Sequence, residues 1–208
     1  MLRIWGRDTS TNVMKVVWLL EEMGVPYERR DVGGPFGGTD TEAYRRMNPT
    51  GLIPTIEEED GFTLFESNAI LRYLAAGHKA GHAYFPHDLR QRANIDRWMD
   101  FQQAYMNPRM AAVFHPLVRL PPEQRDMEKI TRDAQAFAAA WAMVEPLLAR
   151  HPYIAGAELS LADFALAPLV HRYFALPIAR PDQPSVRAWY DRLLQRPAYA
   201  AHVARPLA

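Results

Sequence analysis

The chain has 208 residues, 49% of them apolar and 23% charged, which is enough for one or two domains with a sizeable core. Its 24 Lys and Arg residues balance 24 Asp and Glu residues, so the zero formal charge gives no reason to expect nucleic acid or an anionic membrane as a partner. The sequence contains no cysteine, which excludes disulfides, thiolate metal sites and a cysteine nucleophile. Any thiol chemistry would therefore need a sulfur atom that arrives with a ligand.

Apolar runs and targeting signals give further expectations. No apolar run approaches the roughly 20 residues that span a bilayer, and the N-terminal stretch MLRIWGRD has no feature of a secretory signal. We therefore expect a cytoplasmic protein without membrane contact. The seven histidines are scattered without the spacing of metal ligands, so we also expect no metal site.

The first 80 residues alternate between strand and helix patterns. Four apolar residues from Val13 to Leu20 recur at helical spacing, Gly24 follows as a stop signal, and Asp60–Gly61 between two extended runs is typical of a hairpin turn. In chain order we expect a strand over 2–5, a helix over 12–23, a strand over 26–32, a helix over 41–49, two strands joined at Asp60–Gly61, and a helix from Ser67. This order predicts a small α/β unit with a mixed sheet.

Strand patterns largely stop after this unit. We expect an α/β domain over 1–80, a linker over 81–89 and an all-helical domain over 90–208. The clearest helix pattern runs from Met127 to Leu148, and Pro146 should kink or end that helix. In the stretch LSLADFAL, Ser160 and Asp163 have the spacing of a capping box, which predicts a structural rather than a catalytic role.

Three motifs and the capping box, in this order, resemble a cytosolic glutathione S-transferase of the bacterial type. The motifs are SxNVxKVVWLLEEMGVPYE, which starts at Ser10, then MNPTGLIPTI, then FESNAILRYLA. The resemblance extends over essentially the whole chain. It implies an α/β plus all-α fold, with a thioredoxin-like N-terminal domain and a helical-bundle C-terminal domain. It also implies a homodimer, glutathione as co-substrate and no tightly bound cofactor.

The second and third motifs would bind glutathione. In the family, the bond before the proline, here Pro54, is cis and exposes the N–H and C=O of the residue that matches Ile53 to the ligand's cysteinyl backbone. The family also binds the γ-glutamyl group at a helix start. There, Ser67 at the N-cap would attract the carboxylate and Glu66 would meet the α-ammonium group.

One position departs from the family pattern. Leu52 stands where many relatives have a lysine for the glycyl carboxylate. The candidates to take over this contact are Arg45, Arg46 and a residue of the partner subunit, and the sequence does not choose among them.

The first motif would activate the thiol. An unperturbed thiol has a pKa near 8.5, and a hydroxyl or amide donor together with a helix N-terminus lowers it. The stretch Trp5–Asp8 offers no tyrosine, which disfavours the family's tyrosine-type site. We expect Ser10 and Asn12 to donate to the sulfur, with Thr11 as the reserve candidate.

A second substrate would lie between the domains. The candidate residues are Arg7 and Asp8 on one side, and Tyr105, Met106, Arg109, Met110 and Phe114 on the other. Aromatic and Met residues at helical spacing are also typical of a plain core. We predict a glutathione transferase that directs the thiolate to a small hydrophobic electrophile or to a peroxide or disulfide. The alternatives are a glutathione-dependent isomerase, a disulfide reductase and a non-catalytic glutathione-binding module.

Overall fold

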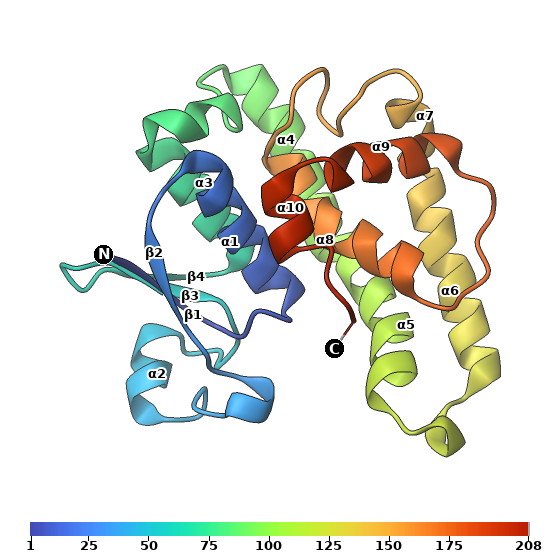
Figure 1. The fold of residues 1–208 in the computed structure, drawn as a ribbon, viewed down its shortest axis with the longest axis horizontal. Helices are drawn as coiled ribbons and strands as arrows, with labels where there is room; N and C mark the ends of the chain where they lie inside the picture. Colours follow the sequence, from blue (N-terminus) through green and yellow to red (C-terminus); the bar gives the residue numbers. More distant parts are fainter. Residues whose placement is uncertain (208) are drawn as a thin grey trace.

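The chain begins with an α/β unit over residues 2–77, called the α/β half below, and the rest is called the helical half (Figure 1). The computed structural model describes residues 1–207. The unit consists of β1 (Leu2–Trp5), α1 (Thr11–Met23), β2 (Tyr27–Arg30), η1 (Gly34–Phe36), α2 (Glu42–Met47), β3 (Thr55–Glu57), β4 (Thr63–Phe65) and α3 (Ser67–Gly77). Its strand order is β2-β1-β3-β4, with β1 parallel to β2 and antiparallel to β3, and β3 antiparallel to β4. The predicted mixed sheet and its hairpin are confirmed.

The second half is helical, as predicted. It consists of η2 (Lys79–Ala83), α4 (Leu89–Phe101), the π-helical segment η3 (Gln102–Met106), α5 (Asn107–Arg119), η4 (Pro122–Gln124), α6 (Met127–Ala142), α7 (Glu145–Leu148), α8 (Leu161–Ala175), α9 (Pro184–Leu194) and α10 (Pro197–His202). Across residues 1–207, the structure has no helix with both the length and the apolar character to cross a membrane.

The helix predicted from Met127 to Leu148 is in fact two helices. α6 ends at Ala142, and Pro146 lies in the first turn of α7, where its missing N–H costs no helical hydrogen bond. The Glu145 side chain, on α7, reaches the start of α9. Its two carboxylate oxygens accept hydrogen bonds there from the N–H groups of Ser185 (2.8 Å) and Val186 (2.9 Å). The expected interruption near Pro146 is therefore present, with Pro146 in the first turn of the second helix.

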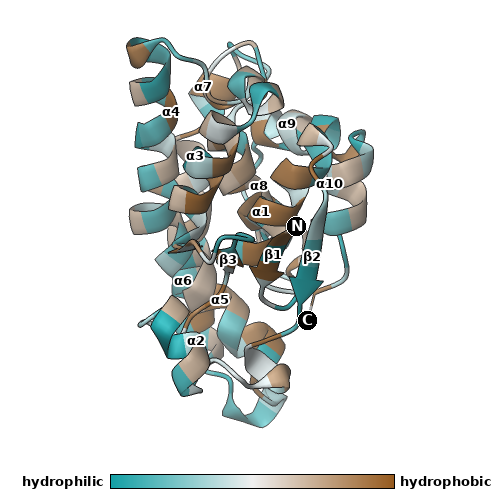
Figure 2. Ribbon diagram, turned by 90° about the vertical axis from the view of Figure 1, so that its left-hand side faces the viewer, coloured by the Kyte–Doolittle hydropathy of each residue, from teal (hydrophilic) through white to brown (hydrophobic). Residues whose placement is uncertain are grey.

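Helix α1 lies at the centre of the fold. It packs against α3 of its own half and against α8 and α10 of the helical half. Figure 2 shows α1 and β1 as strongly hydrophobic elements inside the molecule. Trp18 takes part in this packing: the centre of its ring lies 4.0 Å from the ring centre of Phe164 and 5.0 Å from that of Tyr199. A helix that is apolar on nearly all sides is expected in such an enclosed place.

Lys15 is the exception on this apolar helix. Its side chain is fully buried, and Nζ donates to Oγ of Ser67 (3.3 Å), Oδ1 of Asn68 (3.3 Å) and Oε1 of Gln102 (2.8 Å). An ammonium group has three donors, so this set uses all of them. Burial lowers the pKa of Lys15 to about 7, and the charge of Glu66 opposes that shift. Lys15 thus connects α1, α3 and η3 through one buried charge.

The capping box before α8 is present and structural, as predicted. The Asp163 carboxylate is fully buried and accepts hydrogen bonds from the N–H groups of Ser160 (2.9 Å) and Ile154 (2.9 Å) and from the indole N–H of Trp189 (3.0 Å). The Ser160 hydroxyl is a fourth donor to this carboxylate. Burial raises the pKa of Asp163 to about 6, although the four hydrogen bonds act in the opposite direction. Asp163 therefore connects the 154–160 loop, α8 and α9.

Replacing Asp163 by alanine should lower the free energy of unfolding by about 3–5 kcal/mol, because several buried donors lose their acceptor. Denaturation in urea, followed by circular dichroism, measures the loss. Asp126→Ala is the matched control, since that exposed carboxylate accepts only from the N–H of Lys129 (2.9 Å) at the start of α6 and should cost about 1 kcal/mol. Equal losses in the two variants would contradict the role given to Asp163.

Lys15 should make stability depend on pH. Its folded-state pKa of about 7 lies below the usual 10.5, so between these values the unfolded chain binds the proton that the folded protein has released. Stability from this group therefore rises with pH across that window. The unfolding free energy of wild type relative to Lys15→Met should increase by about 1.4 kcal/mol per pH unit between about pH 8 and 9. A difference that is independent of pH would rule this out.

Candidate functional site

The start of α1 leaves polar groups available. Ser10 is the N-cap residue, with extended backbone (φ −82°, ψ 123°), and its carbonyl accepts from the N–H of Met14 (2.9 Å). Its hydroxyl caps no helical N–H in the described chain. The first N–H groups of a helix lack intrahelical partners and carry the positive end of the dipole. Helix capping therefore does not occupy the Ser10 hydroxyl.

Asn12 and Thr11 differ in what they offer. Oδ1 of Asn12 is buried and has no hydrogen-bond partner within residues 1–207, which is uncommon because a buried unpaired polar atom costs stability. Unpaired buried polar atoms of this kind are found at binding sites. Thr11 is nearly buried instead, with 6% of its surface exposed. Ser10 and Asn12 are thus more exposed than Thr11, and a hydrogen bond from Asn12 to a thiolate would have to come from Nδ2, because Oδ1 only accepts.

The loop before β3 brings a second set of groups to the same place. The Ile53–Pro54 peptide bond is cis, as the resemblance implied. The N–H and C=O of Ile53 form no hydrogen bond with other described residues. Gly6, in the loop after β1, allows this approach, because a Cβ there would lie 3.3 Å from Cβ of Ile53 and 2.5 Å from Cγ2 of Val13. Ile53 thus lies beside the start of α1.

A buried polar cluster holds this loop in position. The Tyr44 hydroxyl donates to the carbonyl of Leu52 (2.7 Å), and Nδ2 of Asn48 donates to the same oxygen (2.8 Å) and to Oγ1 of Thr55 (3.1 Å). Asn48 was predicted only as part of the helix over 41–49 and of the second motif, and this role was missed. The sequence signal was Asn-Pro-Thr, because Oδ1 of Asn48 also accepts from the N–H of Thr50 (3.1 Å), as in an Asx turn.

The start of α3 contributes a third set of groups. Ser67 was expected at the N-cap, but Glu66 is the N-cap residue and Ser67 is the first helical residue. The reason is local: Glu66 has a positive φ of 68°, and its carbonyl accepts from the N–H of Ile70 (2.9 Å). A positive φ is uncommon outside glycine and is concentrated at functional positions. Ser67 is buried, and its hydroxyl accepts from Lys15 while keeping its own proton to donate.

These contacts bring together the three motifs. The Gly6–Ile53 approach joins the loop before β3 to the start of α1, and the Lys15–Ser67 hydrogen bond joins α1 to the start of α3. The result is a region that presents a hydroxyl, an amide, an unpaired peptide group and a carboxylate.

The structure distinguishes the candidates for the missing lysine. Leu52 is exposed, and Nη1 of Arg45 donates to the Pro49 carbonyl (2.9 Å) in the same loop. Arg46 instead pairs with Glu42 at 2.7 Å, one helical turn away. Of the two, Arg45 is the one held beside the loop that carries Leu52.

The residues expected to line a second-substrate site have different surroundings. Tyr105 and Arg109 are half-buried, and the Arg109 guanidinium lies 3.5 Å from the centre of the Tyr105 ring. Phe101, which the sequence did not single out, stacks on Tyr105 at 5.1 Å. Met106 and Phe114, in contrast, are fully buried, and Met110 is nearly so. These three belong to the core, contrary to the expectation, because the apolar face of η3 and α5 packs inward.

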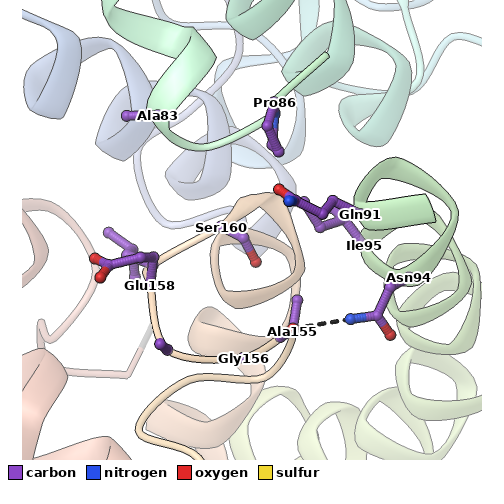
Figure 3. Close-up of a pocket in the computed structure, with 11 residues that line it drawn as sticks. Ala83, Pro86, Gln91, Asn94, Ile95, Ala155, Gly156, Glu158 and Ser160 are labelled. Atoms are coloured by element: carbon purple, nitrogen blue, oxygen red, sulfur yellow. Dashed lines mark hydrogen bonds between the residues drawn. The ribbon is translucent and has the colours of Figure 1, made fainter. Parts of the chain in front are cut away.

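A pocket of about 340 Å³ lies elsewhere, between α4 and the loop before α8 (Figure 3). Gln91, Asn94 and Ile95 line it from α4, and Nδ2 of Asn94 donates to the Ala155 carbonyl (2.8 Å). It includes none of the predicted site residues. Across the described range, no three His, Asp or Glu side chains are grouped so as to hold a metal ion.

Comparison with protein families identifies both halves. The family model described as "Glutathione S-transferase, N-terminal domain" matches residues 9–76, and the one described as "Glutathione S-transferase, C-terminal domain" matches residues 105–197. Glutathione S-transferase GstB of Escherichia coli K12 is 35% identical over 208 residues, which is 100% of each chain. Glutathione S-transferase 3 of Zea mays is 31% identical over 98% of this chain and 93% of its own.

A solved structure agrees with this comparison. The theta-class glutathione S-transferase of Xanthomonas axonopodis pv. citri, crystallised with glutathione bound, is 40% identical, with a TM-score of 0.94. The match covers 100% of this chain and 99% of that one. Fold, family models and full-length relatives all agree: the chain belongs to the glutathione S-transferases, a family of enzymes.

Proposed function

We propose that this protein binds glutathione where its three motifs meet, stabilises the thiolate there and directs it to a second substrate. The observation that carries the proposal is the set of available groups at that place: the Ser10 hydroxyl, which caps no helical N–H, and the peptide N–H and C=O of Ile53, which are unpaired among the described residues. The similar Xanthomonas protein was crystallised with glutathione, which supports the same ligand here.

Glutathione would be held along its length by groups of the α/β half. Its cysteinyl N–H and C=O would pair with the C=O and N–H of Ile53, in the manner of an added strand. Its γ-glutamyl carboxylate would accept from the Ser67 hydroxyl and from backbone N–H groups at the start of α3, where the helix dipole favours an anion. The exposed Glu66 carboxylate would meet the α-ammonium group.

The start of α1 would ionise the thiol. The Ser10 hydroxyl and the side-chain N–H of Asn12 would donate hydrogen bonds to the sulfur. The positive end of the α1 dipole would stabilise the thiolate further. Each unit by which the thiol pKa falls corresponds to about 1.4 kcal/mol. In this mechanism Ser10 and Asn12 donate hydrogen bonds and never form a covalent bond, so catalysis rests on electrostatic stabilisation and proximity.

The second substrate would approach from the helical half. Tyr105 and Arg109 are half-buried there and would offer it an aromatic surface and a cation. We assign this side to a small hydrophobic electrophile, or to a peroxide or disulfide that the thiolate reduces. The proposal includes a cytoplasmic homodimer whose domains span 1–80 and 90–208, joined by the linker 81–89.

Replacing Ser10 or Asn12 by alanine should raise the pKa of bound glutathione by about 1–2 units, because one hydrogen bond to a charged group is worth about 1.5–3 kcal/mol. The measurement is an ultraviolet titration of the thiolate in the complex. Thr11→Val is the matched control, since it removes a nearby hydroxyl at nearly constant volume and should leave that pKa unchanged.

The other outcomes are equally distinct. A shift in Thr11→Val with none in the two alanine variants would assign the donor role to Thr11. Glutathione that binds with an unshifted thiol pKa would indicate a non-catalytic binding module. Absence of binding at millimolar glutathione would contradict the proposed function altogether.

A further inference from the structure

Four basic residues from three separate parts of the chain lie together beside the start of α1. This basic cluster consists of Arg7 in the loop after β1, His115 and Arg119 on α5, and Arg172 on α8. The Phe114 ring lies beneath two of them, because its centre is 3.6 Å from Cζ of Arg172 and 5.9 Å from Cζ of Arg119. Arg172 also reaches across to the α/β half, where its Nη2 donates to the carbonyl of Thr9 (3.1 Å).

The charges of the basic cluster act on one another. Burial, together with the charges of Arg119 and Arg7, lowers the pKa of Arg172 to about 9. Burial together with the charge of Arg119 also lowers the pKa of Arg7. The pKa of His115 falls for the same reasons, first by burial and then by the three guanidinium charges. The four groups therefore lie in one region of positive potential.

Among residues 1–207, no carboxylate forms an ion pair with any member of the basic cluster. Asp8, next to Arg7, pairs with Arg205 at 2.7 Å instead. Arg172 is nearly buried, with 6% of its surface exposed, and its hydrogen-bond partners within residues 1–207 are neutral: the Thr9 carbonyl and the Met110 sulfur (3.4 Å).

A partly buried arginine elsewhere in the chain shows the usual arrangement. Arg196 donates to both carboxylate oxygens of Glu22, at 2.7 and 2.6 Å. A buried guanidinium without such a partner destabilises a fold, so stability does not explain why the basic cluster is present. An anionic ligand would supply the missing charge.

The position of the basic cluster indicates which ligand. Thr9, the acceptor for Arg172, directly precedes Ser10, so the cluster adjoins the place proposed for the sulfur. Three of its four members come from α5 and α8 of the helical half, whereas the groups proposed for glutathione come from the α/β half. We propose that Arg7, Arg119 and Arg172 bind a carboxylate or similar oxyanion on the second substrate, so that the enzyme favours anionic electrophiles. This inference rests on the proposed function.

The carboxylate proposed on the second substrate takes no part in the reaction itself. With an aryl chloride, the glutathione thiolate forms a C–S bond at the carbon that carries chlorine. The C–Cl bond breaks, chloride leaves with the bonding pair, and the thiol proton has already gone to solvent. The carboxylate only binds, and guanidinium groups suit it because they donate two parallel hydrogen bonds.

Glutathione itself carries another carboxylate, on its glycine. Arg7 could meet that group, because its guanidinium lies against the loop after β2, where a Cβ on Gly34 would be 3.2 Å from its Cζ. The experiment must therefore vary the two carboxylates independently.

The test compares 4-chloro-3-nitrobenzoate with its neutral amide, 4-chloro-3-nitrobenzamide, as second substrates for the full chain. Arg119→Gln and Arg7→Gln should each lower kcat/KM for the benzoate by about tenfold, while kcat/KM for the benzamide changes by less than about twofold. Arg132→Gln is the charge-matched control, since its exposed side chain lies on α6 and should change neither value. Arg172→Met should act like Arg119→Gln, with circular dichroism as the check on folding.

A second arm replaces glutathione by its glycyl ethyl ester, with the neutral benzamide as electrophile. The ratio of the KM values for the ester and for glutathione should be the same in wild type and in the Arg7 and Arg119 variants, because Arg45 beside the Leu52 loop, and not the basic cluster, would meet the glycyl carboxylate. Suppose instead that KM in wild type is much higher for the ester than for glutathione, and that the Arg7 or Arg119 variant removes this difference. The cluster would then bind glutathione, and the proposal would be overturned. Equal losses for benzoate and benzamide would also overturn it. Failure to bind glutathione at all would instead contradict the proposed function.

Discussion

The buried ammonium group of Lys15 is the constraint on which the site depends. It lies inside an otherwise apolar helix, and its three acceptors belong to the start of α3 and to η3. A charged group in this place needs all of its hydrogen bonds, since an unpaired buried charge is costly. The same bonds fix the Ser67 hydroxyl relative to α1. One interaction therefore joins the two halves of the molecule and sets the geometry of one end of the proposed glutathione site.

The chemistry of the start of α1 follows from its neighbours rather than from its own residues. A serine before a helix usually serves as a cap, but here the Ser10 hydroxyl caps no N–H of the described chain. The cis Ile53–Pro54 loop lies next to it because Gly6 has no side chain. The basic cluster borders it from the helical half. Peptide groups, donors and positive charge thus surround one position, which suits a thiolate and a partner electrophile.

Much of the fold could be predicted from the sequence. The spacing of apolar residues from Val13 to Leu20 and the Asp60–Gly61 turn placed their elements correctly because both signals are local. The helix pattern from Met127 continues to Leu148, and Pro146 was expected to kink or end the helix. The structure ends α6 at Ala142, a few residues before Pro146, and the pattern did not show this position because apolar periodicity continues across the break. Ser67 was placed one position too early in its helix, because no local signal shows the positive φ of Glu66.

The candidate site was less accessible to sequence reasoning. The family resemblance supplied its residues, and the structure shows how Ser10, Ile53 and Ser67 are brought together. Met106 and Phe114 were chosen as substrate contacts, but core and pocket residues share the same helical spacing, and both are buried. The basic cluster could not have been foreseen, because Arg7, Arg119 and Arg172 are brought together only by tertiary structure. Likewise, the sequence alone gives no sign that the Lys15 side chain is buried.

The central claim is that the sulfur of glutathione lies at the start of α1. A crystal structure of this protein with glutathione tests it most directly. We expect the sulfur within hydrogen-bonding distance of the Ser10 hydroxyl or the Asn12 amide, with the cysteinyl backbone paired to Ile53. Glutathione with its sulfur away from α1, or bound in the pocket beside Asn94 and Ala155, would contradict the account.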